Sequence, residues 1–128
     1  MQDPHDQITA AHKLIADPAR WSRGALARDK HGREVSPTSK RAAAWDVRGA
    51  LQAVCGTRCG ADDKGSAVAR CNYLCCTADL CAHRAFKSTL ERATDDRGHA
   101  AAVEVLRRAW RQVQVDPPKQ DAFGGGNY

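Results

Sequence analysis

The sequence predicts a mainly α fold: a compact single domain of four to five short helices with a small β-hairpin near residues 25–35 and a flexible C-terminal tail. Three observations support this prediction. The 128 residues suffice for one modest hydrophobic core. Apolar residues make up 42% of the chain but aromatic residues only 5%, which favours small side chains on closely packed helices. Apolar residues also recur at the spacing that places them on one helical face.

The N-terminal half is expected to contain two helices separated by the hairpin. Asp3 can cap a helix that begins at Pro4, a residue tolerated in the first turn, and this helix should end near residues 17–18. Residues 24–35 should form two short extended segments around a turn that ends at Gly32. Residues 36–39 have turn and helix-cap chemistry. The helix after them should bury a face formed by Trp45, Val47, Ala50, Leu51 and Val54.

The C-terminal half is expected to contain three further helices. Ser66 can cap one helix, Thr77 or Asp79 can begin another, and residues 94–98 are expected to form a linker. The last helix should begin near His99 and end before Asp116, so the α-rich domain spans residues 1–115. Residues 116–128 include three consecutive glycines and form a tail that is flexible or held by a partner. The expected core consists of Trp45, Leu51, Val54, Phe86, Leu90, Val103, Leu106 and Trp110.

All six cysteines lie in one segment, residues 55–83, which is chemically the most unusual part of the chain. Four of them form two pairs with three intervening residues, and 11 residues separate the pairs. Residues at i and i+4 share one face of a helix, so each pair can present two sulfurs to a neighbouring segment. The candidate disulfide or metal residues are Cys55, Cys59, Cys71, Cys75, Cys76, Cys81 and His83.

Three interpretations of these thiols stay open. Cysteine pairs that face each other fit disulfides within or between chains. Four sulfur ligands, or three with a histidine, fit a structural zinc site. A cysteine can also be a plain buried residue. No cofactor is therefore expected, with zinc as the possible exception. Cys75 and Cys76 point about 100° apart on a helix, so one of them should face outward and be able to reach another chain.

The positive charge is concentrated in residues 20–41. This segment holds seven basic residues against two acidic ones, and its surplus equals the net charge of +5 for the whole chain. Such a patch can bind nucleic acid, anionic lipid or an acidic protein surface. The basic interaction patch is Arg20, Arg23, Arg28, Lys30, Arg33, Lys40 and Arg41.

The chain lacks the sequence signatures of common enzymes and of targeting segments. No phosphate loop, zinc-protease helix or dinucleotide fingerprint is present, so we expect no catalytic residues and no small-molecule substrate. The N-terminal residues have no basic start followed by an apolar run, so we expect no secretory signal, and no stretch approaches the ~20 apolar residues of a membrane span. We therefore expect synthesis in a cytoplasm, where disulfides are rare, and no membrane partner. A cysteine-rich chain without a signal fits a protein that later leaves the cell.

Several segments resemble a family of small bacterial and bacteriophage proteins catalogued as a domain of unknown function. They are residues 14–21, 24–29, 32–38, 49–51, 93–99 and 103–109 together with Trp45, and the similarity covers roughly residues 8–113. In that family Asn-Asp usually stands in place of Thr94-Asp95, and cysteine is common at the position of Asp46. The resemblance implies a compact, mostly helical domain from a prokaryote or phage. The spacing of the cysteine pairs is also similar to that of the small twin-cysteine chaperones of the intermembrane space.

Together these observations predict a non-enzymatic structural or interaction protein. The leading expectation is a bacteriophage virion component, made in the bacterial cytoplasm, stabilised by disulfides and packed against other subunits of the particle. The alternative is a cytoplasmic, zinc-stabilised binding module for nucleic acid or a host protein, which would use residues 20–41 for phosphates.

Overall fold

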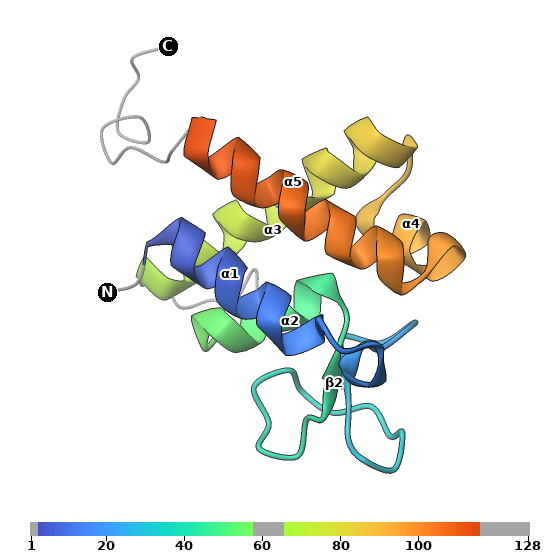
Figure 1. The fold of residues 1–128 in the computed structure, drawn as a ribbon. Coiled ribbons are helices and arrows are strands. Elements are labelled where there is room, and N and C mark those ends of the chain that lie inside the picture. Colours follow the sequence, from blue (N-terminus) through green and yellow to red (C-terminus); the bar gives the residue numbers. More distant parts are fainter. Residues whose placement is uncertain (1–2, 58–65, 116–128) are drawn as a thin grey trace.

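The computed structural model describes residues 3–57 and 66–115, and this part of the chain forms a mainly α-helical domain, as predicted (Figure 1). Five α-helices, one short 3-10 helix and one two-stranded sheet are present among the described residues. The predicted tail, residues 116–128, lies outside them. In chain order the elements are α1 (Pro4–Ile15), η1 (Pro18–Arg20), β1 (Ala27–Arg28), β2 (Ala44–Trp45), α2 (Val47–Cys55), α3 (Ser66–Phe86), α4 (Leu90–Arg97) and α5 (His99–Val115).

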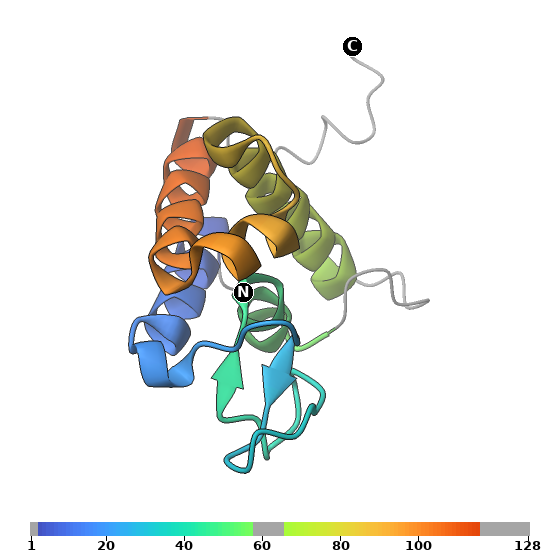
Figure 2. The same cartoon turned by 90° about the vertical axis from the view of Figure 1, so that its right-hand side faces the viewer.

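The helices pack around one core of small side chains. Helix α1 packs against α2 and α5, α3 packs against α2 and α5, and α4 closes one end against α3 and α5 (Figures 1 and 2). Alanine and cysteine fill positions where the helices approach one another, as the low aromatic content predicts. The largest fully buried side chains are Ile8, Ile15, Val47, Leu51, Leu74, Leu90, Val105, Leu106 and Val113.

Capping side chains fix where the helices begin. The Asp3 carboxylate accepts a hydrogen bond from the Asp6 amide at 2.8 Å, which confirms the predicted start of α1. The cap of α2 is Asp46, whose Oδ1 accepts from the Gly49 amide at 2.6 Å, so the prediction of a helix cap at residues 36–39 is wrong. Those residues form turns instead. Helix α2 ends at Gly56, in the left-handed conformation that glycine adopts easily.

The predicted hairpin is present, but its longest pairing reaches farther along the chain. The Asp29 amide donates to the Arg33 carbonyl and the Val35 amide to the Ala27 carbonyl, which pairs the two predicted segments within residues 25–35. Strand β1 also pairs antiparallel with β2, in the register Ala27 opposite Trp45. The strand that completes the sheet therefore lies directly before α2, outside the predicted range.

Helix α3 is continuous where a break was predicted. Thr77 does not begin a new helix, because its hydroxyl donates to the Tyr73 carbonyl one turn earlier at 2.8 Å. The Asp79 carboxylate instead accepts from the Leu90 amide at the start of α4. The predicted linker at residues 94–98 is also wrong, because this stretch is helical up to Arg97.

The predicted core is correct at its centre and shifted on α5. Leu51, Leu90 and Leu106 are buried. Trp45, Val54, Phe86 and Trp110 are partly buried and pack against the core. Val103 is the exception, since the buried face of α5 consists of Ala102, Val105, Leu106, Ala109 and Val113. Two alanines, two valines and one leucine therefore form the contact side of this helix. No helix in the described ranges is both long and apolar enough to cross a bilayer.

Candidate functional site

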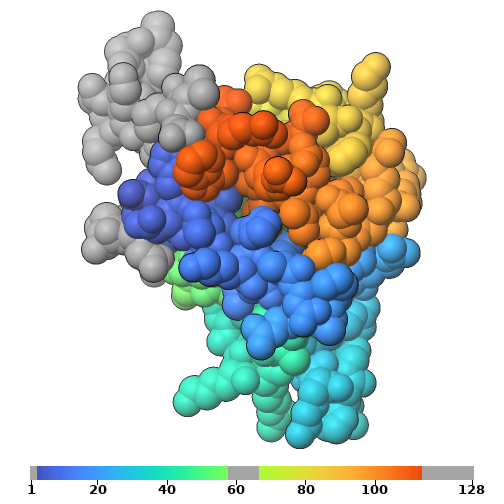
Figure 3. Space-filling model, in the orientation of Figure 1, coloured from blue at the N-terminus to red at the C-terminus, as the bar shows by residue number. Residues whose placement is uncertain are grey.

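Two loops project from the helices at the lower end of the molecule in Figures 1 and 3. The first, residues 29–33, is organised by one carboxylate. Asp29 Oδ1 accepts hydrogen bonds from the His31 and Arg33 amides, each at 2.9 Å. The bond from Arg33 is the main cause that lowers the pKa of Asp29 below its ordinary value. Gly32 has a φ of +83°, which permits the turn.

The second loop, residues 36–43, is held by two turns and a tryptophan. The Ser39 amide donates to the Ser36 carbonyl at 2.9 Å, and the Ala42 amide donates to the Ser39 carbonyl at 3.1 Å. The indole N–H of Trp45 donates to the Pro37 carbonyl at 3.0 Å, while the Trp45 ring packs against the core. The loop is therefore attached directly to the helical body.

Basic side chains from both loops surround one pocket of about 620 Å³. Lys30 and Arg33 come from the first loop, and Lys40 and Arg41 from the second; all four line the pocket. The Asp29 carboxylate in the lining offsets one of these four charges, which leaves a surplus of three positive charges around the pocket. We call this site the basic pocket; its lining residues are Asp29, Lys30, His31, Arg33, Lys40, Arg41, Ala42 and Ala43.

The other three residues of the predicted basic patch lie elsewhere. The guanidinium of Arg28 donates to the carbonyls of Gly32 at 3.0 Å and Arg23 at 3.2 Å, so Arg28 holds the hairpin together. Arg23 stacks over the Trp21 ring at 5.3 Å from its centroid. Arg20 is exposed at the end of η1. Sequence position alone gave no means of separating these structural arginines from the pocket residues.

The predicted cysteine cluster is only partly within the described residues. Cys71 and Cys75 are buried on the same side of α3, as their spacing predicted, and the Cys71 thiol lies 3.9 Å from the Thr57 carbonyl oxygen. Cys55 is partly buried at the end of α2, where the Gln7 amide donates to its sulfur at 3.7 Å. Cys59 lies outside the described residues.

The remaining candidates separate along α3. Cys76 is exposed and Cys81 is buried, with 4% of its surface accessible, so the expectation that one of the adjacent Cys75 and Cys76 faces outward is confirmed. His83 is exposed. No disulfide joins two cysteines of residues 3–57 and 66–115, and the same ranges contain no group of three or more His, Cys, Asp or Glu arranged to hold a metal ion. Zinc and disulfides stay predictions.

Sequence reasoning did not find an ion-pair cluster that joins three helices. Arg48 of α2 contacts Asp79 of α3 at 2.7 Å and Glu91 of α4 at 2.6 Å. Both carboxylates raise the pKa of the guanidinium, against the effect of burial. Asp46 lies near this cluster and is 8% exposed. Burial is the main cause that raises the pKa of Asp46 from 3.8 to about 7. The partners are 31 and 43 residues from Arg48, too far for a local pattern to reveal.

A second set of contacts joins the early and late segments of the chain. The His99 ring nitrogen Nε2 lies 2.6 Å from the Ile15 carbonyl oxygen, and the ring meets Trp21 edge-on. The Gly24 amide donates to the Asp95 carboxylate at 3.2 Å. These residues come from the two halves on which the family resemblance rests. Their role in the structure is to hold the segment after α1 against α4 and α5.

Comparison with known proteins places the chain in a family. No curated protein and no solved structure matches it. The model of the family of unknown function DUF6197 matches residues 1–112, which cover most of the chain and nearly all of the described helices. The chain therefore belongs to the family of unknown function DUF6197.

Proposed function

We propose that the chain is a non-enzymatic interaction protein that binds the phosphate backbone of nucleic acid through the basic pocket. The observation that carries this proposal is the convergence of Lys30, Arg33, Lys40 and Arg41 on one concave site. Within residues 3–57 and 66–115, none of these four cations forms an ion pair. Their charge is therefore available to an external anion.

The chemistry of the four side chains suits phosphate oxygens. A guanidinium offers a fork of donors that can bind two oxygens of one phosphate, and an ammonium acts as a compact point charge. The loops that carry them are fixed by backbone hydrogen bonds and by Trp45, so little ordering is needed on binding. Binding of this kind releases counterions and weakens steeply as salt rises.

The test is the binding of a fluorescently labelled DNA duplex, followed by anisotropy at several salt concentrations. The variant K40Q/R41Q should weaken binding. The plot of the logarithm of the association constant against the logarithm of salt concentration should also become less steep by about 2, because each phosphate contact contributes about 0.9 to the steepness. The matched control is R20Q, an exposed arginine of the same segment outside the pocket, which should change the slope by less than half as much. A duplex that does not bind, or equal losses in both variants, refutes the proposal and leaves an acidic protein as the partner to examine.

We also propose that the protein is a component of a bacteriophage particle. The outer face of α3 favours this second proposal. Cys76 is an exposed thiol there, and Leu80, one turn later, is 42% exposed. An apolar side chain beside a thiol suits contact with a neighbouring subunit. Outside the cell, dioxygen would then oxidise two Cys76 thiols, one from each chain, to an inter-chain disulfide and take up their two protons and two electrons. Virions should then contain the protein as a covalent dimer that reductant separates and C76S prevents. Purified particles without the protein would exclude this role.

Zinc stays the alternative route to stabilisation of the cysteine segment. Protein purified under reducing conditions would carry one zinc per chain and would lose its fold when a chelator is added. A metal content well below one per chain would exclude this alternative.

A further inference from the structure

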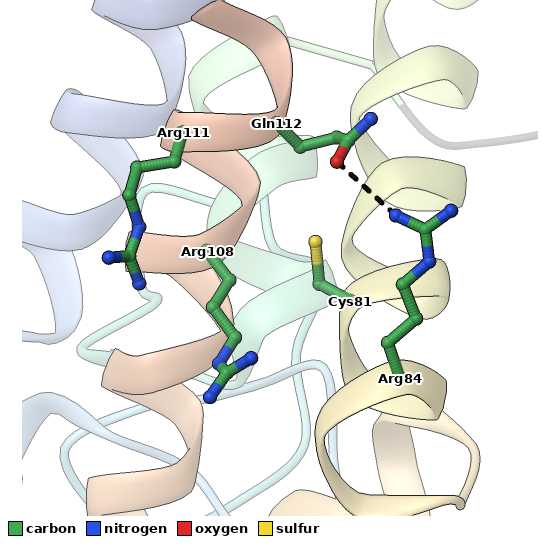
Figure 4. Close-up of a pocket in the computed structure, with 5 residues that line it drawn as sticks. All are labelled: Cys81, Arg84, Arg108, Arg111 and Gln112. Carbon is green, nitrogen blue, oxygen red and sulfur yellow. Dashed lines mark hydrogen bonds between the residues drawn. The ribbon is translucent and has the colours of Figure 1, made fainter. Parts of the chain in front are cut away.

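A second cationic site lies far from the basic loops, between α3 and α5 (Figures 1 and 4). It is a cleft of about 460 Å³, a volume within the range of small-molecule sites. Figure 4 shows the Cys81 thiol directed into the space between the two helices. We call this site the arginine cleft; its lining residues are Cys81, Arg84, Arg108, Arg111 and Gln112.

The three arginines of the cleft are only partly neutralised. Glu104 pairs with Arg108 at 2.8 Å and more loosely with Arg111 at 3.8 Å. Arg84, on the opposite wall, donates to the neutral side chain of Gln112 at 3.3 Å, and it forms no ion pair with any residue of the described ranges. Three guanidinium groups and one carboxylate leave a surplus of two positive charges around the opening.

The thiol at the inner end of the cleft is uncharged and does not repel an anion. Burial raises the pKa of the Cys81 thiol, an effect that Arg84 and Arg108 reduce. The sulfur therefore stays protonated at neutral pH, carries no negative charge and offers a weak S–H donor. Apart from the Gln112 carbonyl, which already accepts from Arg84, the polar side-chain groups of the lining are mainly donors.

We propose that the arginine cleft binds the phosphate group of a small molecule. A phosphate monoester is a dianion at neutral pH, which matches the surplus of two positive charges, and its oxygens accept hydrogen bonds from guanidinium forks. Arg84 and Arg111 are exposed and weakly held, so they can turn to a ligand without breaking a short ion pair. Arg108 keeps its contact with Glu104 and contributes long-range attraction.

Cys81 provides a reporter that is specific to this cleft. We would measure its alkylation rate by peptide mass spectrometry, with inorganic phosphate as the probe and chloride at matched ionic strength as the reference. Phosphate should slow alkylation of Cys81 and leave that of the exposed Cys76 unchanged. Because Cys81 is buried, general stabilisation of the fold by phosphate at the basic pocket also slows its reaction, so the measurement is repeated in K40Q/R41Q, in which the protection should persist.

Matched variants complete the test. The protection constant is the phosphate concentration that halves the alkylation rate of Cys81. R84Q should raise this concentration by about tenfold or more, and R111Q should raise it as well. R107Q, an exposed arginine of α5 that is not in the lining, should change the constant less than twofold. Circular dichroism checks that each variant is folded. Absence of protection in the wild type, or equal protection constants in R84Q and R107Q, overturns the proposal.

Discussion

Replacement of Asp46 by asparagine should stabilise the protein at alkaline pH and leave its stability nearly unchanged at acid pH. The carboxylate is buried at the start of α2, and burial raises its pKa from 3.8 to about 7. Between about pH 4 and pH 7 the unfolded chain has lost this proton while the folded chain keeps it. The contribution of Asp46 to the free energy of unfolding therefore falls as pH rises through that window and is constant above it.

The size of the effect follows from the pKa. Each pKa unit corresponds to about 1.4 kcal/mol, so the ionised carboxylate costs at most about 4 kcal/mol above pH 7. The asparagine side chain in D46N would keep the capping bond to the Gly49 amide. The pKa of about 7 is a net result that already includes this bond, so nothing further is subtracted. We expect D46N to gain about 3–4 kcal/mol at pH 8.5 and to match the wild type at pH 4.5 within about 1 kcal/mol.

The assay is urea denaturation under reducing conditions, followed by circular dichroism at a series of pH values. Asp3 gives a matched control, since it also caps a helix through its carboxylate but is exposed. D3N should change stability by less than about 1 kcal/mol at every pH. A gain for D46N that is the same at pH 4.5 and pH 8.5, or no gain at pH 8.5, would refute the argument from burial.

Two further substitutions test the packing around α2. R48Q removes the ion pairs to Asp79 and Glu91, whose side chains are 43% and 48% exposed. We therefore expect the free energy of unfolding, measured by urea denaturation, to fall by about 1–2 kcal/mol. A fully buried pair would cost roughly 3–5 kcal/mol. A loss below about 0.5 kcal/mol would mean that the cluster contributes little. G49A places a methyl group 1.8 Å from the Leu26 carbonyl oxygen, so it should lower the thermal midpoint and cost about 3 kcal/mol or more; an unchanged midpoint would contradict this contact.

The elements that the sequence predicted well are those with strong local signals. The start of α1 is the clearest case, since it depends on Asp3 and Pro4. The break expected in α3 shows the limit of such signals. Thr77 has the chemistry of a cap, but its hydroxyl bonds within the helix, and only tertiary packing decides between these two partners.

The candidate sites were harder to predict for a geometric reason. The basic segment was identifiable from its charge, yet four of its cations face a pocket while Arg28 holds backbone carbonyls of its own hairpin. The arginine cleft joins residues of α3 and α5 that are about a quarter of the chain apart, and no local pattern marks them as neighbours. Of the cysteine predictions, two followed from helical geometry: Cys71 and Cys75 share one side of α3, and one member of the adjacent pair faces outward.

The position of Trp45 links the binding loops to the stability of the whole domain. Its ring is part of the packing around the core and its N–H holds Pro37 in the second basic loop. Displacement of that loop would leave a partly buried indole without its acceptor, which is unfavourable. Release of the loop alone should therefore cost about 1–3 kcal/mol, so the indole hydrogen should exchange with solvent more slowly than that of an unbonded indole but faster than the core amides. Lys40 and Arg41 thus lie on a loop that one side-chain hydrogen bond attaches to the helical body.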